Sequence, residues 1–266
     1  MAGGAHAEPV ALREGVFQLG GPKGGGCKVY LLRGARKNLL VDTGLSSDAD
    51  LIAAQLGMLG LSREDVHIVV LTHEHVDHVG GVPYFPERTV VAAHNRAANK
   101  IALQDEFVLM SQAFGHRAED FHVDLHLHHG TLIDLGGCVL QTLHSPGHCS
   151  GAICLYDAER QLLFTGDTIF AGGTLGGIFP SGNISDYIGT LRELSSLRVA
   201  EMYPGHGRIS TDAPADFERA IRGSKNLMVE TRDLFDTLQS RSEFGDIMKY
   251  VATYSRRAAA EQDGEH

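Results

Sequence analysis

The heptapeptide Thr72-His73-Glu74-His75-Val76-Asp77-His78 constrains this chain most, because it gathers three histidines and an aspartate of metal-ligand type. It follows the apolar run 68–71, whose length and β-branched content predict a buried strand. The ligands then lie in the loop at the carboxyl end of that strand, where open α/β sheets place their chemistry. Imidazole and carboxylate groups bind zinc, iron or manganese. The stretch predicts a metal site, against the alternative of a polar surface loop.

Three more predicted strands lead into a residue of metal-ligand type that is flanked by glycine. The motifs are SPGHCSG at 145–151, FTGDT at 164–168 and YPGHG at 203–207, and the candidate ligands are His148, Asp167 and His206. Glycine lets the backbone bend sharply and bring such a side chain into a crowded centre. Three repeats of the pattern, added to the heptapeptide, favour one shared metal site.

Composition narrows the class of protein. The chain has 266 residues, of which 43% are hydrophobic, and this is ample for one sizeable core. Its net charge of −10 disfavours nucleic acid as a partner. The four cysteines form no C-x-x-C pair, which indicates reduced thiols in a cytoplasmic protein. We find no secretory signal at the N-terminus and no apolar run long enough to cross a membrane.

The order of predicted elements indicates an α/β fold. Strands come in two batches, each followed by helix, and this favours two sheets packed face to face with helices outside. We expect a catalytic domain over 1–213 and a helical C-terminal extension of the same domain over 214–266. The predicted strands are 15–19, 28–33, 38–41, 66–71, 89–93, 122–128, 131–134, 138–143, 152–156, 162–165 and 201–203, and the other predicted helices are 46–59, 95–114 and 185–197.

With these motifs the chain resembles the metallo-β-lactamase-fold hydrolases over residues 15 to about 210, on THEHVDH, SPGHCSG, FTGDT and YPGHG. The resemblance implies an αββα sandwich of two mixed sheets with outer helices. It also implies one metal held by His73, His75 and His148, a second held by Asp77, His78 and His206, and Asp167 as the bridge. Asp42 in the motif LVDTG would orient the metal loop.

Coordination chemistry agrees with this implied set. Seven ligands are too many for one tetrahedral ion but fit two ions that share a bridge. We therefore expect two zinc ions per chain, with iron or manganese as alternatives, and a metal-bridging hydroxide as the nucleophile. Asp77 and Asp167 are the predicted catalytic residues. We find no G-x-S-x-G elbow that would supply a serine nucleophile instead.

Within the family, YPGHG resembles the glyoxalase II and thioesterase branch, while Asp167 counts against a true β-lactamase. The glutathione-binding basic residues of glyoxalase II have no clear match at Arg222, Lys225 or Lys249. The leading hypothesis is a dinuclear hydrolase of a thioester, lactone or ester. The alternatives are a mononuclear iron sulfur dioxygenase and a metal-dependent phosphodiesterase or RNase.

The segments expected near the metals favour a small acyl substrate over a nucleic acid. Residues 72–86 and 165–183 contain no lysine or arginine. They supply ten apolar side chains that suit an acyl chain: Val76, Val79, Val82, Tyr84, Phe85, Ile169, Phe170, Leu175, Ile178 and Phe179. Nearby cations at Arg96, Lys100 and Arg208 would hold a carboxylate or a carrier phosphate. We expect the pocket to be lined by the loop 171–183, the 95–114 helix and the C-terminal helices. The alternative is that the C-terminal helices pack only on the core or on a second subunit of a homodimer.

Several other tempting residues have a plainer interpretation. His122, His126 and His128 alternate along one predicted strand, which is typical of a solvated face. Cys149 directly follows a ligand, and we interpret it as packing behind the site. Glu74 is held in the metal loop without an assigned role.

Overall fold

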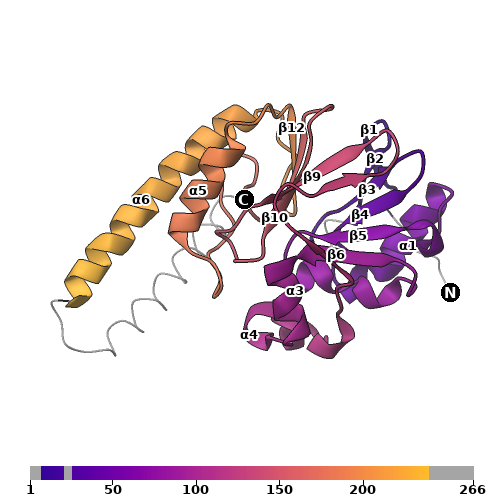
Figure 1. Cartoon of the computed structure of the whole chain (residues 1–266), viewed down its shortest axis with the longest axis horizontal. Coiled ribbons are helices and arrows are strands. Elements are labelled where there is room, and N and C mark those ends of the chain that lie inside the picture. The colour runs from indigo at the N-terminus through magenta and orange to yellow at the C-terminus, as the bar shows by residue number, and fades with distance from the viewer. Residues whose placement is uncertain (1–6, 21–25, 240–266) are drawn as a thin grey trace.

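The computed structural model describes residues 7–20 and 26–239 and has two β-sheets packed between outer helices (Figure 1). The predicted αββα sandwich is thereby confirmed. The first sheet is ordered β1 to β7, with strands Val10–Arg13, Val16–Leu19, Val29–Arg33, Asn38–Val41, Ile68–Leu71, Val90–His94 and Leu125–Leu127. The second is ordered β12-β11-β10-β9-β8, and β8 to β12 are Leu132–Asp134, Val139–His144, Ile153–Asp157, Leu162–Gly166 and Glu201–Pro204.

Both sheets are mixed, and the directions of their strands bring several carboxyl ends to one edge. Strands β4, β5, β6 and β7 are parallel neighbours in the first sheet. In the second sheet β11 is parallel to β12, and β9 points the same way as β11 because β10 lies antiparallel between them. The residues that follow β5, β9, β11 and β12 can therefore meet.

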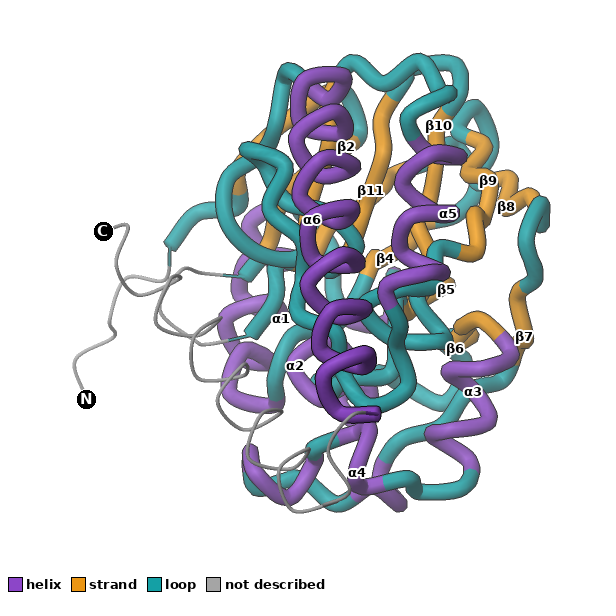
Figure 2. Tube along the Cα trace, turned by 90° about the vertical axis from the view of Figure 1, so that its left-hand side faces the viewer, coloured by secondary structure: helices purple, strands orange, loops and turns teal. Residues whose placement is uncertain are grey.

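Helices cover the outer face of each sheet. Helices α1 (Ala49–Met58) and α3 (Asn95–Ala102) pack on the first sheet, while α5 (Ile184–Leu194) and α6 (Ala213–Gln239) lie side by side over the second (Figure 2). The shorter segments are α2 Val76–Val79, α4 Glu106–Leu109 and the 3-10 turns Ser46–Asp48, Arg63–Asp65, Val82–Tyr84, Ser111–Phe114 and Ala118–Asp120.

The alternation of side chains along the strands builds the core in layers. In β5, Val69 and Leu71 face the helices on the outer side, whereas Val70 faces the second sheet. Tyr30 and Phe164 meet between the sheets with ring centroids 5.4 Å apart. Because β5 is buried on both faces, its sequence is a continuous apolar run, as the sequence analysis predicted.

Three sequence expectations differ from the structure. The strand β1 was not predicted, because VALR has little alternation of its own and pairs only with β2. The expected helix over 95–114 is wrong as one element: it breaks at Gln104 and Met110, whose φ angles of +53° and +57° cannot continue a helix. The helical turn α2 was missed inside the metal loop. By contrast, Gly60 ends α1 with φ of +73°, as predicted.

The C-terminal helix begins at Ala213, close to the predicted start of the extension, and is described as far as Gln239. The rest of the predicted extension, including the predicted break near Gly245, lies outside the described residues. The division at 213/214 stays a prediction. Among the helices of the described ranges, none is both long and apolar enough to cross a membrane.

Candidate metal centre

The metal loop, residues 72–78, is extended at His75 and helical from Val76 onward. Its four candidate ligands consequently lie in two separate groups. His75 is extended, with φ of −70° and ψ of 145°, and it caps the N-terminus of α2. His73 and His75 both precede α2, and Nε2 of His73 lies 3.0 Å from Nδ1 of His75. Asp77 and His78 follow in the first turn of α2, which carries them round to a neighbouring position.

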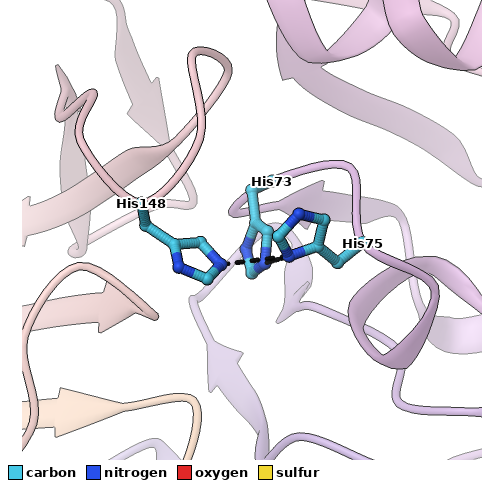
Figure 3. Close-up of side chains that lie close together, drawn as sticks. All are labelled: His73, His75 and His148. Atoms are coloured by element: carbon cyan, nitrogen blue, oxygen red, sulfur yellow. Dashed lines mark hydrogen bonds between the residues drawn. The ribbon is translucent and has the colours of Figure 1, made fainter. Parts of the chain in front are cut away.

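The first ligand group joins the metal loop to the loop after β9. Nε2 of His73 and Nε2 of His148 each lie 3.0 Å from Nδ1 of His75 (Figure 3). The three rings meet edge to face and are almost fully buried. These are the three residues that the resemblance assigned to the first metal.

The second ligand group consists of Asp77, His78 and His206, whose ligand atoms lie within 4.8 Å of one another. Nε2 of His206 is 3.0 Å from Oδ2 of Asp77, and Nε2 of His78 is 3.6 Å from the same oxygen. His206 comes from the turn after β12, so this group joins the two sheets. It is the set assigned to the second metal.

Asp167, at the end of β11, lies between the two groups. Its Oδ1 is 3.4 Å from Nε2 of His78, and its Oδ2 is 3.7 Å from Nε2 of His206 and 3.9 Å from Nε2 of His148. The carboxylate thus lies within 4 Å of a histidine of each group, and its role as a bridge stays a prediction. The structure thus brings all seven predicted ligands together, and their coordination of ions stays a prediction.

The donor set fits metal ions. Nδ1 of His75 carries one proton or one lone pair, so it forms a proper hydrogen bond with only one of the two nitrogens 3.0 Å away. A zinc ion about 2.0–2.1 Å from each nitrogen sets tetrahedral ligands about 3.3 Å apart, close to these separations. Nε2 of His78 and Oδ1 of Asp167 are buried and lack a hydrogen-bond partner within the described part of the chain. Cations in the two groups would satisfy all of these atoms.

The protonation of the first ligand group also favours a cation. Burial and the nearby imidazole of His148 lower the pKa of His75 to about 3, so its ring is neutral at pH 7. Burial likewise lowers the pKa values of His73 and His148. Burial by itself would raise the pKa of Asp167, but the imidazoles of His78, His206 and His148 outweigh it and lower the pKa. The first group therefore presents neutral imidazoles beside the ionised Asp167. In the second group burial opposes the charging of His78, but Cys27 and the carboxylates of Asp77, Asp42 and Asp167 outweigh it and raise the pKa of His78 above its ordinary value.

Close glycines make room for this geometry. A Cβ on Gly205 would lie 2.5 Å from Oδ1 of Asp167 and 2.8 Å from Cε1 of His78. A Cβ on Gly166 would lie 2.6 Å from Oγ1 of Thr72, and its φ is +48°. Both positions need glycine, as expected for residues that flank crowded ligands.

Two aromatic rings flank the ligands. The Phe179 ring lies 4.6 Å from the ring of His75 and 5.0 Å from that of His148, and the Phe170 ring lies 6.2 Å from that of His206. Ile178 beside Phe179 is 42% exposed. Apolar surface therefore borders the metal centre on the side of the 171–183 loop.

Most of the other predicted wall residues are elsewhere. Four of them are fully buried in the cores and cannot line a pocket: Val76, Val79, Val82 and Ile169. Tyr84 packs near Arg63 instead, with the guanidinium 5.7 Å from its ring centroid. The error arose because nearness in sequence to a ligand does not decide which face of the element a side chain takes.

The remaining histidines behave largely as predicted. His122, His126 and His128 are exposed, as expected of a solvated face. His94 and His144 form a pair that the sequence did not reveal: they end β6 and β9 in different sheets, and their rings stack at 3.9 Å with 10° between the planes. They lie outside the groups of possible metal ligands found in the described ranges.

Two further residues lie beside the site, and neither has a role assigned from the sequence. Glu74 is completely buried, and Lys28 is half-buried with its N–H donating to the carbonyl of Gly205 at 2.7 Å. The position of Glu74 between two ligands was a usable signal. Lys28 had none, because only the pairing of distant strands brings it to Gly205.

The chain belongs to the metallo-beta-lactamase superfamily, because residues 22–206 match the model of that family. This span contains all seven candidate ligands. Its fold and its site define the chain as a metal-dependent hydrolase, and its sequence is thioesterase-like.

Two curated relatives are similar to most of the chain. The human acyl-coenzyme A thioesterase MBLAC2 is 34% identical over 209 residues, which are 69% of this chain and 74% of the relative. The beta-lactamase-like protein 2 homolog of Caenorhabditis elegans is 27% identical over 244 residues, 90% of this chain and 76% of the relative.

Solved structures of the superfamily share the fold. A metallo-beta-lactamase family protein from Thermus thermophilus has a TM-score of 0.69 at 24% identity, and the match covers 81% of each chain. The subclass B3 enzyme BJP-1 of Bradyrhizobium japonicum has a TM-score of 0.66 at 20% identity, over 90% of this chain and 97% of that one.

Proposed function

We propose that this protein hydrolyses acyl thioesters at a centre of two zinc ions, and that its natural substrates are acyl-coenzyme A thioesters. The observation that carries the proposal is the pair of ligand groups with Asp167 lying between them, beside an apolar border. The likeness to an acyl-coenzyme A thioesterase supports the choice of thioester over lactone or ester. When bound, two zinc ions supply Lewis acidity to a carbonyl oxygen and to water.

The exposure of the ligands indicates where the substrate approaches. The side chains of Asp77, Asp167 and His206 are 21%, 12% and 36% exposed, whereas those of His78 and His148 are 0% and 2% exposed. The thioester therefore reaches the centre over the two carboxylates and His206, with its acyl chain against Phe179.

Asp77 is placed to orient the water that attacks the carbonyl. Burial opposes its ionisation, but the charge of His78 and the hydrogen bond from His206 lower its pKa, so it is a carboxylate at pH 7. A carboxylate beside the reacting carbonyl accepts a proton from water as the carbon–oxygen bond forms. The carbon–sulfur bond then breaks, and the sulfur takes the proton held by Asp77 and leaves as the thiol.

The border of the site supports an acyl substrate over a nucleic acid. Of the cations that the sequence placed near the ligands, Lys100 is engaged elsewhere, since its Nζ lies 3.0 Å from Oδ2 of Asp105. A nuclease needs a row of cations for successive phosphates. The predicted absence of nucleic-acid and membrane partners is part of this proposal.

A substrate panel tests the proposal. Purified protein with its metals determined by elemental analysis is offered an acyl-coenzyme A, the matching lactone or oxygen ester, and single-stranded RNA. We expect thioester hydrolysis to have the highest kcat/KM and to be lost with a chelator. Salt-sensitive RNA cleavage with inert thioesters would overturn the proposal, and one iron per chain with oxygen consumption would indicate a sulfur dioxygenase.

A further inference from the structure

The carboxyl group of Glu74 is buried beside the metal centre and is used by none of the steps above. Glu74 stands between the ligands His73 and His75, and its side chain is 0% exposed. Its Oε2 lies 3.4 Å from Sγ of Cys149, and its Oε1 lies 3.3 Å from Oγ of Ser181. The metal loop is thus joined through one side chain to two other loops.

Ser181 completes this connection. Its Oγ accepts a hydrogen bond from the N–H of Ser150 at 3.1 Å, which leaves its own proton free to donate to Glu74. The chain approaches Glu74 closely, because a Cβ on Gly151 would lie 2.4 Å from Oε2. Each oxygen of the carboxyl group therefore faces a donor in a site shaped around it.

Ser181 belongs to a stretch that covers the metal centre, and residues 176–182 are called the covering segment here. The carbonyl of Gly177 accepts a hydrogen bond from Nδ1 of His148 at 2.6 Å, which leaves Nε2 of that ring to face the metal site. The N–H of Phe179 donates to the carbonyl of His148 at 2.9 Å. The covering segment thus orients one ligand and holds the Phe179 ring against the centre.

The start of the same loop is held from the other side of the protein. Oδ1 of Asp216 accepts a hydrogen bond from the N–H of Gly172 at 2.9 Å, and Nε of Arg219 donates to the carbonyl of Gly172 at 2.9 Å. The hydroxyl of Tyr187 reaches the carbonyl of Gly176 at 3.3 Å. At the far end of the covering segment, just before the N-cap of α5 at Asn183, the side chain of Ser181 bonds it to Ser150 and Glu74.

We propose that Glu74 is a positioning residue that fixes the covering segment over the metal centre through Ser181, and so sets the affinity for the acyl group. A buried carboxyl group is costly, and an apolar side chain of similar volume would pack without that cost. The two donors aimed at Glu74 explain why a carboxyl group stands there. The inference rests on the proposed function only in that acyl thioesters are used to measure affinity.

Four variants test the inference: Glu74→Met, which removes both acceptors at similar volume, Glu74→Gln, which keeps one acceptor for Ser181, Ser181→Ala, and the double variant Glu74→Met/Ser181→Ala. Ser185→Ala, an exposed serine on α5, is the matched control. Two measurements are made on the metal-loaded protein: amide hydrogen exchange over residues 176–182, and kcat and KM for an acyl thioester.

We expect Ser181→Ala and Glu74→Met each to speed exchange in the covering segment about tenfold and to raise KM about tenfold, with a smaller change in kcat. The double variant should change clearly less than the sum of the single variants, because both remove the hydrogen bond between Ser181 and Glu74. Glu74→Gln should stay near wild type, and Ser185→Ala should match it.

Unchanged exchange in Ser181→Ala, or additive effects in the double variant, would overturn the inference. If Glu74→Met loses metal or fails to fold, the amide exchange and the KM of Ser181→Ala still test the inference. If the wild type hydrolyses no thioester, the proposed function fails, while the exchange data still test the connection.

Discussion

Nδ1 of His78 lies 2.9 Å from Oδ2 of Asp42, and both side chains are almost completely buried. This contact occupies the ring nitrogen that faces away from the metal centre, so Nε2 is left to face Asp77 and Asp167. The same carboxylate accepts hydrogen bonds from the N–H and the hydroxyl of Thr72, at 2.7 and 2.8 Å. One side chain therefore sets both the end of β5 and the orientation of a ligand, as the family resemblance implied for Asp42.

Asp42→Asn tests this relationship without disturbing the backbone. Asp42 has φ of +61°, a conformation that asparagine tolerates. In the variant, an NH2 group replaces one carboxylate oxygen and faces a hydrogen-bond donor of Thr72 or His78. We therefore expect the unfolding free energy to fall by about 1–3 kcal/mol. We also expect affinity for the second metal to fall about 10–100-fold. Urea titration and metal titration measure the two effects, and unchanged metal affinity would contradict the role.

Two variants separate the two metals. Asp167→Ala removes the carboxylate between both ligand groups, so we expect it to lose both ions or nearly all activity. His206→Ala affects one group, so we expect about one ion per chain to remain against about two in the wild type. Elemental analysis of the dialysed proteins gives the stoichiometry. A wild type with one ion, unchanged by His206→Ala, would contradict the two-metal assignment.

Gly205→Ala should damage the centre by steric contact alone. The new Cβ would lie 2.5 Å from Oδ1 of Asp167, so either the carboxylate or the turn after β12 must move. We expect at least about tenfold loss of kcat/KM, since small displacements of reacting groups are costly. Gly189→Ala, inside α5 with open space around it, is the control and should stabilise the protein by up to about 1 kcal/mol. Equal activity of the two variants would show that the turn yields freely.

We predict that the His94–His144 pair makes the stability of the folded protein sensitive to acid. Burial and the nearby His144 lower the pKa of His94 to about 3, against an ordinary value of 6.5. Below pH 6.5 the unfolded chain takes up a proton that the folded chain refuses, so this contribution to stability is complete above pH 6.5 and is lost as the pH falls toward 3.

The size of the effect follows from the linkage. The unfolding free energy should fall by at most about 1.4 kcal/mol per pH unit through this residue. His94→Phe keeps a ring beside His144 and should reduce the difference in unfolding free energy between pH 7 and pH 5.5. Urea titrations of wild type and variant at the two pH values measure it, and parallel losses would assign the acid sensitivity to other groups.

We predict that Lys28 helps to bind the coenzyme A part of an acyl-coenzyme A substrate. Its backbone N–H donates to the carbonyl of Gly205, and its side chain is half-buried, which lowers the pKa of the ammonium group. Lys28 forms no ion pair with a carboxylate of the described ranges. A phosphate of coenzyme A would compensate its charge. Lys28→Met should raise KM for an acyl-coenzyme A about tenfold and leave KM for an uncharged thioester of the same acyl group unchanged. Lys37→Met, in the exposed turn at the opposite end of β3, is the control; equal effects on both substrates would contradict carrier binding.

The elements that could be predicted from the sequence are those in which burial alone decides the residue types. Buried strands such as β5 and β11 are apolar runs whose ends coincide with ligands, so both the strands and the ligand set were predictable. The family resemblance supplied the grouping of the ligands, because spacing alone does not tell which side chains share an ion.

The remaining features depend on tertiary contacts. The break in the 95–114 helix requires positive φ at Gln104 and Met110, neither of which is a usual residue for that conformation. The side chains that border the site follow from the faces that each element buries, which is why Phe179 reaches the centre and Val76 does not. The connection from Glu74 to Ser181 spans 107 positions and leaves no local pattern.

Because the candidate ligands follow strands of both sheets, they emerge from the ribosome at different times during synthesis. Four of them precede β6, while His148, Asp167 and His206 follow strands of the second sheet. A ribosome that has released the chain only through β7 has therefore exposed a complete first sheet and neither complete ligand group. The first group closes only when His148 emerges, and the second waits for His206. Capture of the full complement of ions must then be a late event in the life of the nascent chain, after nearly the whole sandwich has been made.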